Sequence, residues 1–318
     1  MESNSTEISV RGRSVKVPSL VIGDRTIIVT GGWLKIARVR DEDWSEGEVV
    51  DSPEEYIQKI KGANLGADIF SFGQKATSAQ LKYNYPFEWD NVAAIPIIDY
   101  KDWWERRLPQ ETRKNVRPAS KRGVVTREVE FSDEFLQGVI KINNETPVRQ
   151  GRPFWHYQKP FDVVKKDYTT LTDRSEYLGA YCEDELIGFM KLVHMGEITG
   201  VLQILCMNKH ADKRPANLLL AKAMEVCCAR KCKFLVYGKY IYGKKLDSAL
   251  TEFKRRNGFE QIMIPRFYVP LNGKGRIAVR LKFHLGVKHV LPKCLQDVAL
   301  SLRSRWYETM LSLREPKV

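Results

Sequence analysis

The sequence lacks the features that several classes of protein require. No run approaches the roughly 18 uninterrupted apolar residues of a membrane span, and the opening MESNSTEISVRGRS has no apolar core of a signal peptide. The six cysteines show no paired CxxC spacing and the five histidines are scattered, so no metal site is expected. No Ser-His-Asp or Cys-His nucleophile pattern is present. We therefore expect a cytoplasmic protein with no metal, no tightly bound cofactor and no covalent enzyme intermediate.

Acidic residues are in short supply. The 318 residues include 52 Lys and Arg against 39 Asp and Glu, which gives a net charge of +13, and 43% hydrophobic content is enough for a buried core. This surplus favours a polyanionic partner such as RNA, a nucleotide-bearing acyl donor or an anionic membrane surface.

The second half of the chain alternates between strand and helix patterns. Three β-rich runs fill residues 175–207, a helix is predicted from Pro215 to about Lys231, and KFLVYGKY follows as a buried strand. A helix in KLDSALTEFKRRNGF, ended by Asn257 and Gly258, then leads to a last strand in EQIMIPRFYVPL. The predicted order is strand, strand, strand, helix, strand, helix, strand.

The first half repeats this order more faintly. Strands are predicted in SLVIG, RTIIVTG and WLKIARV, and DSPEEYIQKI opens a helix with Pro53 at its first position and a capping box of Ser52 and Glu55. The stretches ADIFSFGQ, KATSAQLKYNY and NVAAIPIIDY run parallel to the strand, helix and strand that end the second half. Their shared order predicts a duplicated fold.

A concentrated basic segment lies between the halves. From residue 101 to 127 there are nine Lys or Arg and three Asp or Glu, which predicts a basic surface at Arg113, Arg117, Lys121 and Arg122. The first three recur at four-residue steps and would share a helix face, although Pro118 is expected to break or kink that helix. A solvated basic face is the alternative to an RNA-binding one.

Six stretches, in order, resemble the Fem-type group of the GNAT superfamily, which includes tRNA-dependent aminoacyltransferases: RKNVRPASKRGV, INNETPVRQGRPFW, DELIGFMKLV, KRPANLLLAKAMEVC, FLVYGKY and LTEFKRRNGF. The resemblance implies an α/β (α+β) fold of two tandem GNAT-like domains, each a mixed sheet flanked by helices, plus a basic C-terminal helix. It predicts a degenerate domain at 1–100, the basic connecting segment at 101–130, the active domain at 131–272 and a basic amphipathic tail at 273–318.

The resemblance also implies a donor site. Ordinary GNAT enzymes hold the diphosphate of acetyl-CoA in a glycine-rich loop before a helix, but the equivalent NKHADKRPANL has no glycine. An anion gripped by side chains is therefore expected, with a solvated basic loop as the alternative. The predicted donor-binding residues are Lys213, Arg214, Asn217, Tyr237, Gly238 and Arg255. The donor is predicted to be acyl-CoA or aminoacyl-tRNA.

For catalysis, the resemblance implies that the pair Phe253 and Lys254 lies at the reaction centre. The lysine would stabilise negative charge on the carbonyl under attack. Tyr83 and Asn84 stand at the corresponding place in the first half, so only the second half is expected to be active. A surface lysine on an amphipathic helix is the alternative. Lys254→Ala is expected to abolish transfer and to leave the melting temperature almost unchanged.

The stretch TPVRQGRPFWHY places cations and aromatics around a glycine turn, which suits a phosphate, a sugar ring or a stacked base. The predicted acceptor-binding residues are Arg149, Arg152, Trp155, Tyr157 and Tyr268. The histidine of this stretch, His156, is more typical of a packed residue than of a catalyst.

The tail from residue 274 to 318 has ten Lys or Arg, three Asp or Glu, and apolar residues at helical spacing. It is expected to dock on its own domain or on a second copy of the chain in a homodimer. The alternative is an interfacial helix that holds the protein at the anionic inner face of a membrane.

Taken together, these patterns favour an acyltransferase that forms an amide on an amine of a sugar, peptidoglycan precursor or other cell-envelope intermediate. The amine would attack a thioester or ester donor directly. The alternatives are a GNAT-fold nucleic-acid-binding protein and an envelope-assembly scaffold with a decayed site.

Overall fold

The computed structural model describes residues 4–10, 13–42, 50–77, 80–149, 151–242 and 248–286. The first half contains β1 (Asn4–Val10), β2 (Arg13–Ile22), β3 (Arg25–Thr30), β4 (Ile36–Val39), α2 (Pro53–Gly62), β5 (Ile69–Gly73) and β6 (Phe87–Pro96). The middle contains α3 (Tyr100–Asp102), the π-helix η1 (Trp103–Arg107), α4 (Gln110–Lys121), β7 (Val124–Val129), α5 (Asp133–Asn143), β8 (Val148–Arg149), β9 (Arg152–Pro153), α6 (Phe161–Tyr168) and η2 (Thr172–Arg174).

The second half follows with the strands and helices that the sequence predicts. It contains β10 (Ser175–Cys182), β11 (Glu185–Met195), β12 (Ile198–Cys206), η3 (Asn208–Lys213), α7 (Pro215–Ala229), β13 (Phe234–Val236), α8 (Ala249–Arg256), β14 (Glu260–Pro270), α9 (Gly273–Arg280) and η4 (Phe283–Leu285). None of the helices in these ranges is long and apolar enough to cross a membrane.

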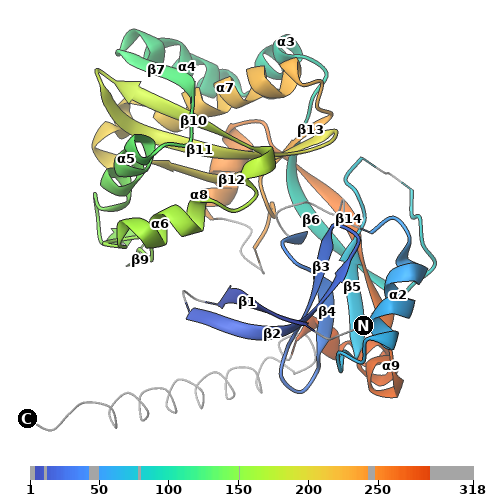
Figure 1. Cartoon of the computed structure of the whole chain (residues 1–318). Helices are drawn as coiled ribbons and strands as arrows, with labels where there is room; N and C mark the ends of the chain where they lie inside the picture. Colours follow the sequence, from blue (N-terminus) through green and yellow to red (C-terminus); the bar gives the residue numbers. More distant parts are fainter. Residues whose placement is uncertain are drawn as a thin grey trace, which may run out of the picture.

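One mixed sheet runs through both halves, in the order β1-β2-β3-β4-β5-β14-β6-β13-β12-β11-β10-β7. Each half contributes a parallel pair, β4 with β5 and β12 with β13. The last strand of each half then crosses into the other: β14 pairs with β5, and β6 pairs with β13. The two exchanged strands pair with each other and join the halves at the middle of the sheet (Figure 1). This near-palindromic order is what a duplicated fold predicts.

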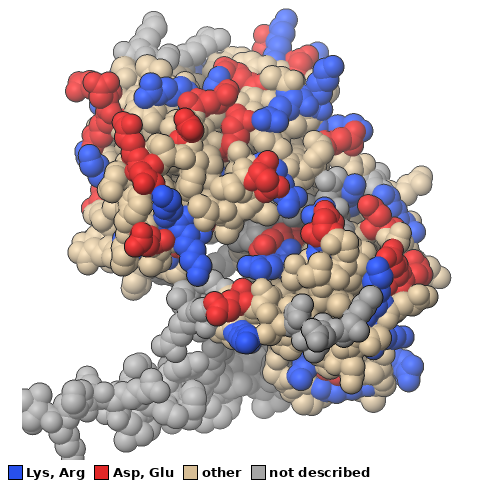
Figure 2. Space-filling view, in the orientation of Figure 1, with Lys and Arg blue, Asp and Glu red and all other residues tan. Residues whose placement is uncertain are grey.

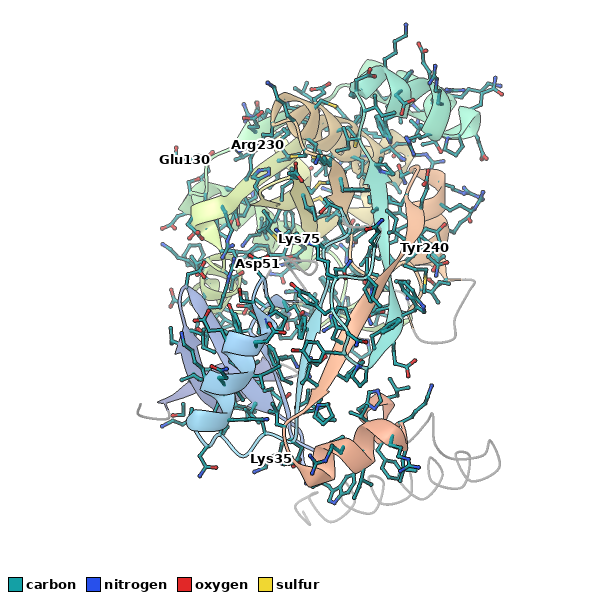
Figure 3. All side chains as sticks on the ribbon, turned by 90° about the vertical axis from the view of Figure 1, so that its right-hand side faces the viewer. Lys35, Asp51, Lys75, Glu130, Arg230 and Tyr240 are labelled. Carbon is teal, nitrogen blue, oxygen red and sulfur yellow. The ribbon has the colours of Figure 1, made fainter. Side chains whose placement is uncertain are left out.

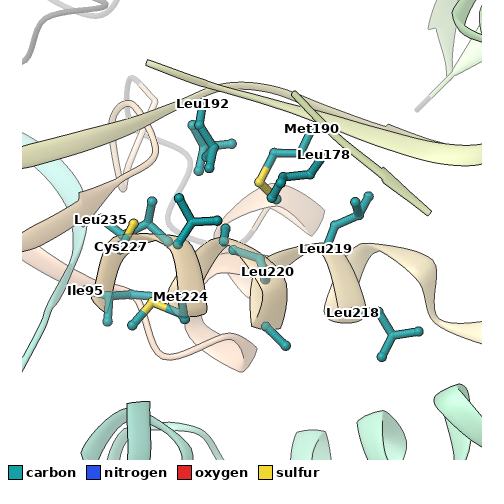
Figure 4. Close-up of a cluster of buried hydrophobic side chains, with 14 of the residues drawn as sticks. Ile95, Leu178, Met190, Leu192, Leu218, Leu219, Leu220, Met224, Cys227 and Leu235 are labelled. Atoms are coloured by element: carbon teal, nitrogen blue, oxygen red, sulfur yellow. The ribbon is translucent and has the colours of Figure 1, made fainter. Parts of the chain in front are cut away.

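Helices cover both faces of the second-half strands. Helix α7 packs its apolar side chains on β10, β11 and β12, in a cluster that includes Leu178, Met190 and Leu219 (Figure 4). A second cluster, on α5 and α6, covers the strands from the other face and contains Phe135 and Phe189. Burial of this apolar surface is the main favourable term that fixes the sheet between the helices.

The first half has a core of its own, centred on Ile27, Phe70 and Phe72, and Phe267 of the crossing strand β14 is part of it. In return, Ile95 of β6 belongs to the second-half core. Each core is therefore completed by a strand from the other half.

The structure confirms the predicted α/β class with a mixed sheet flanked by helices. Three local predictions are wrong. Helix α2 begins at Pro53, but Ser52 makes no side-chain capping bond. Helix α4 continues through Pro118 to Lys121, so the expected break does not occur. The described residues of KATSAQLKYNY form turns, bends and irregular structure where a helix is predicted. The tail beyond residue 286 lies outside the described residues.

Candidate active site at the junction of the two halves

A cavity of about 310 Å³ opens where the parallel strands β12 and β13 diverge. The two strands pair only from Ile198 to Gly200. Beyond that point β12 continues, whereas Gly238 adopts a positive φ of 53° and turns the chain out of β13. The strand ends are therefore separated, and Val201, Leu202 and Tyr237 line the resulting space.

The cavity wall carries four paired charges from both halves. Lys239 contacts the Asp90 carboxylate at 2.8 and 2.9 Å, and Arg266 donates to Glu42 at 2.8 Å and lies 3.6 Å from Asp90. Burial alone would raise the pKa of Asp90, but the Lys239 ammonium, together with Arg266, holds it below its ordinary value. Asp90 is therefore ionised at neutral pH.

Lys254 lies directly behind this wall. Its helix, α8, is capped by Ser248, which accepts the Thr251 N–H at 3.0 Å. The Lys254 side chain is fully buried, and its ammonium donates to the Lys239 carbonyl at 2.6 Å. The same ammonium lies 4.5 Å and 5.0 Å from the ring centroids of Tyr237 and Tyr242, which line the cavity. The Lys254 amino group is thus held beside the cavity at a position that water does not reach.

This burial excludes the alternative of a surface lysine. It also corrects the expectation that Lys254→Ala leaves the melting temperature unchanged, because a buried side chain would be replaced by a void and the Lys239 carbonyl would lose a donor. Phe253, its neighbour, is half-buried and packs against the second-half core. Burial, and secondarily Tyr242, raises the pKa of Tyr237, so that its phenol stays protonated.

The loop before α7 is occupied by the protein's own groups. The Glu145 carboxylate accepts the N–H groups of Asn208 and Lys209 at 2.7 and 2.8 Å, and the Lys209 side chain pairs with Glu185. Lys213 donates to the Cys182 sulfur at 2.9 Å, a contact that raises the pKa of Lys213. An internal carboxylate thus binds the first two N–H groups of η3, the turn that precedes α7.

The remaining predicted donor residues lie in three separate places. Tyr237 and Gly238 line the cavity, while Arg214 is exposed at the start of α7 with a left-handed φ of 54°. Asn217 donates to the Asn257 side chain at 2.8 Å and so ties α7 to the end of α8. Arg255 is on the outer surface, paired with Glu252 at 2.7 Å.

The predicted acceptor residues lie away from the cavity wall. The Arg149 guanidinium donates to the carbonyls of Ile142 and Cys206 and to Glu145, and burial, opposed by Glu145, lowers its pKa. Trp155 is half exposed under the Lys159 ammonium, which lies 3.0 Å from its ring centroid. The Arg152 side chain lies outside the described part of the structure. Tyr157 belongs to the same segment, and Tyr268 packs on His284, 4.3 Å between ring centroids.

The basic segment packs against α7 rather than standing free. Arg113 donates to the Trp104 carbonyl at 2.9 Å, and Arg122 donates to the Asp212 carbonyl in the loop before α7. The side chains of Arg117 and Lys121 are outside the described set. Figure 2 shows cationic and anionic side chains intermixed over the visible face rather than gathered in one basic stripe.

Sequence reasoning missed the charged wall of the cavity. Arg266 interrupts the apolar run of its strand, a pattern that marks a charge held inside a fold, whereas Asp90 stands among polar residues and gives no such signal. The signal of Arg266 was available. Glu42 and Tyr242 carry no comparable signal, because they reach the cavity from loops whose path the sequence does not reveal.

No protein-family model matches the chain, and no curated protein matches its sequence. Solved structures do share its fold. The crystal structure of FemX matches with a TM-score of 0.55 at 12% identity, over 83% of this chain and 88% of that one. L-PGS from Bacillus licheniformis matches with a TM-score of 0.51 at 13% identity, over 81% and 86%. The C-terminal domain of a putative lysylphosphatidylglycerol synthetase from Agrobacterium fabrum matches at 0.50 and 14%, over 82% and 87%.

These likenesses confirm, at the level of the fold, the predicted resemblance to the Fem-type GNAT group.

Proposed function

We propose that the chain is an acyltransferase that moves an acyl or aminoacyl group from a thioester or ester donor to an amine, and that the carbonyl under attack lies in the junction cavity. The observation that carries this proposal is the buried Lys254 ammonium behind the wall formed by Tyr237 and Tyr242. The fold supports it, because FemX and the lysylphosphatidylglycerol synthetases share the same architecture. An amine of a cell-envelope, peptidoglycan or polysaccharide precursor is the proposed acceptor.

The chemistry needs few groups. Attack of the amine forms a C–N bond and places negative charge on the carbonyl oxygen, and the C–S or C–O bond of the donor then breaks. The amine proton leaves with the departing sulfur or oxygen. A fixed cation in a site with little water stabilises the charged intermediate by several kcal/mol, since it needs no reorganisation during the reaction.

A carboxylate of the wall suits the acceptor. Asp90 is ionised, and its carboxylate, which already binds Lys239, is the proposed hydrogen-bond acceptor for the incoming amine. The volume of about 310 Å³ accommodates a small acyl group together with the attacking amine.

The loop before α7 bears on the choice of donor. Because Glu145 occupies the N–H groups of Asn208 and Lys209, fewer main-chain donors are left for a diphosphate, and the exposed Arg214 is the proposed contact for the anionic part of the donor. This arrangement favours an aminoacyl ester of RNA over acyl-CoA, because an RNA donor can be held by contacts spread over the surface.

The test is a transfer assay with the full chain. Purified protein is mixed with an aminoacyl-tRNA pool or with acetyl-CoA and an amino-sugar or a lysyl peptide, and the N-acylated amine is measured by mass spectrometry. Transfer by the wild type and its loss in Leu202→Trp, which fills the cavity, would support the proposal. No product with either donor, together with salt-sensitive binding of uncharged RNA, would replace it with the nucleic-acid-binding alternative.

A further inference from the structure

The end of α7 places two cysteines in contact. The helix ends at Ala229, and Lys231 takes a left-handed φ of 56°. The N–H of Lys231 donates to the Cys228 carbonyl at 3.0 Å, and the N–H of Cys232 donates to the Cys227 carbonyl at 2.9 Å. This is the Schellman pattern, in which the side chains at the two ends of the longer bond meet. Here those side chains are the thiols of Cys227 and Cys232, which are both buried in the second-half core.

A chain of polar contacts leads from Cys232 to the surface. The Cys232 sulfur lies 3.1 Å from the Thr199 hydroxyl, which lies 2.9 Å from Nδ1 of His194. Nε2 of His194 lies 3.1 Å from the Glu176 carboxylate, which also accepts from Arg230 at 2.9 Å. Arg230 is at the outer edge of the second half (Figure 3). The order thiol, hydroxyl, imidazole, carboxylate gives the Cys232 proton a path to a base.

The electrostatics of the two thiols differ. A hydrogen bond from the Cys227 thiol lowers the pKa of Cys232, although burial acts in the opposite direction. Hydrogen bonds with His194 and Thr199 lower this pKa further. The hydrogen bond from the Cys227 thiol, together with burial, raises the pKa of Cys227 itself. The polar chain reaches the sulfur of Cys232, which favours Cys232 as the attacking sulfur of the pair.

We propose that Cys227 and Cys232 form a redox-active pair that a peroxide converts into a disulfide, with Cys232 as the attacking sulfur. Cys232 retains 5% exposure and Cys227 none, so a small oxidant meets Cys232 first. The proposal does not depend on the acyltransferase function. Burial of the two cysteines in an apolar core would not by itself account for the chain of polar contacts that ends at Cys232.

The reaction balances with hydrogen peroxide as oxidant. The Cys232 thiolate attacks one oxygen, the O–O bond breaks, and the departing hydroxide takes up the proton that Cys232 has given to the polar chain, to become water. The product is a sulfenic acid on Cys232. The Cys227 sulfur then attacks the Cys232 sulfur, the S–O bond breaks, and the second hydroxide leaves as water with the Cys227 proton. Two thiols and one peroxide give one disulfide and two waters.

The position of the pair links it to the junction cavity. Strand β13 begins at Phe234, two residues after Cys232, and continues into Tyr237 and Gly238 of the cavity wall. A covalent bond between the end of α7 and the start of β13 would therefore act on the segment that leads directly into that wall.

The test uses the reduced full-length protein. It is treated with hydrogen peroxide, blocked with an alkylating agent and digested with trypsin, which cuts at Arg230 and Lys231 and so separates the two cysteines. The expected product is a cross-linked peptide pair, Cys227 to Cys232, that disappears on reduction. Cys228→Ser is the matched control: the residue is next to the pair, and its variant should oxidise like the wild type. Cys227→Ser should stop at a Cys232 sulfenic acid.

The polar chain is tested by the rate. Thr199→Val, which removes the hydroxyl with little change of shape, and His194→Gln should each slow the reaction of Cys232 with peroxide about tenfold or more, in protein whose melting curve shows that it is folded. Absence of the cross-link, a cross-link through Cys228, or unchanged rates in both variants would overturn the proposal.

Discussion

The two halves of the molecule share one order of strands but differ just before their last strand. In the second half, α8 presents Lys254 to the cavity wall. In the first half, the described part of the corresponding segment is not helical, and Tyr83 there donates to the carbonyls of Val50 and Asp51 at 3.1 and 3.2 Å. Tyr83 holds a loop in the first half. Its counterpart in the second half is Phe253, the residue before the buried Lys254. The two halves therefore differ in whether a helix stands before the last strand, and the proposed function assigns the chemistry to the half that has it.

The halves are nevertheless not independent. Because β6 and β14 are exchanged, each core contains a strand of the other half, and the cavity takes Asp90 from one and Lys239 from the other. The first half thus completes the site even though it lacks α8.

Removing a side chain from an exchanged strand should have the largest effect. Phe267→Ala, in the first-half core, is expected to lower the free energy of unfolding by about 3–5 kcal/mol, and the reciprocal Ile95→Ala by about 2–5 kcal/mol, because both side chains are fully buried. Urea denaturation followed by circular dichroism measures both. One shared transition in each variant supports joint folding of the halves, whereas two transitions, only one of them shifted, would show that the halves unfold separately.

Two glycines with positive φ, one in each half, should give a smaller loss of stability when each is replaced by alanine. Gly23 and Gly238 have positive φ of 60° and 53°, and an added Cβ meets nothing within 4 Å at Gly23 but lies 2.6 Å from the Tyr242 hydroxyl at Gly238. Gly23→Ala should cost about 1 kcal/mol of left-handed strain, and Gly238→Ala about 2 kcal/mol. Only Gly238→Ala should also slow transfer, since Tyr242 borders the cavity. If both variants lost the same amount of activity, the result would contradict the assignment of Gly238 to the active site.

The smallest expected effect concerns pH. The Trp155 indole donates to Nε2 of His156 at 2.7 Å, and burial, followed by the Lys159 ammonium, lowers the pKa of His156 to about 4 from its ordinary 6.5. Between these two values the unfolded state binds the additional proton, so stability falls as the pH is lowered through this range.

The contribution between pH 7 and pH 5 should be about 1 kcal/mol, because partial solvation of the ring reduces the full linkage value. Urea titrations of the wild type and His156→Gln at both pH values measure it. The variant should lose less stability on acidification, and an identical loss in both proteins would contradict the assignment.

Much of the fold could be predicted because its signals are local. Pro215 and the apolar residues that follow it predict α7, and Asn257 with Gly258 predicts the end of α8. The exchange of β6 and β14 could not be predicted, since both strands are visible in the sequence but their partners are chosen by packing between distant segments. The missing helix in the first half has a related cause: the repeat of residue order suggested a helix there, but tertiary contacts such as those of Tyr83 override a local pattern.

The candidate site was predicted in part. The resemblance drew attention to Lys254, and the structure shows it buried beside the cavity. The donor role of the loop with Lys213 stays a prediction, and composition reports the positive charge of this loop but not the Glu145 carboxylate that binds its start. The roles of these residues in transfer remain predictions.

The central claim is that the buried cation of the second half drives transfer, and a comparison of two neighbouring side chains tests it most directly. Lys254 is buried beside the cavity and Arg255 is exposed and paired with Glu252. With saturating donor and amine, kcat should fall about 100-fold or more in Lys254→Met, which keeps the length of the side chain without its charge, and should stay within about twofold of the wild type in Arg255→Ala. Transfer by folded Lys254→Met at the wild-type rate would contradict the account.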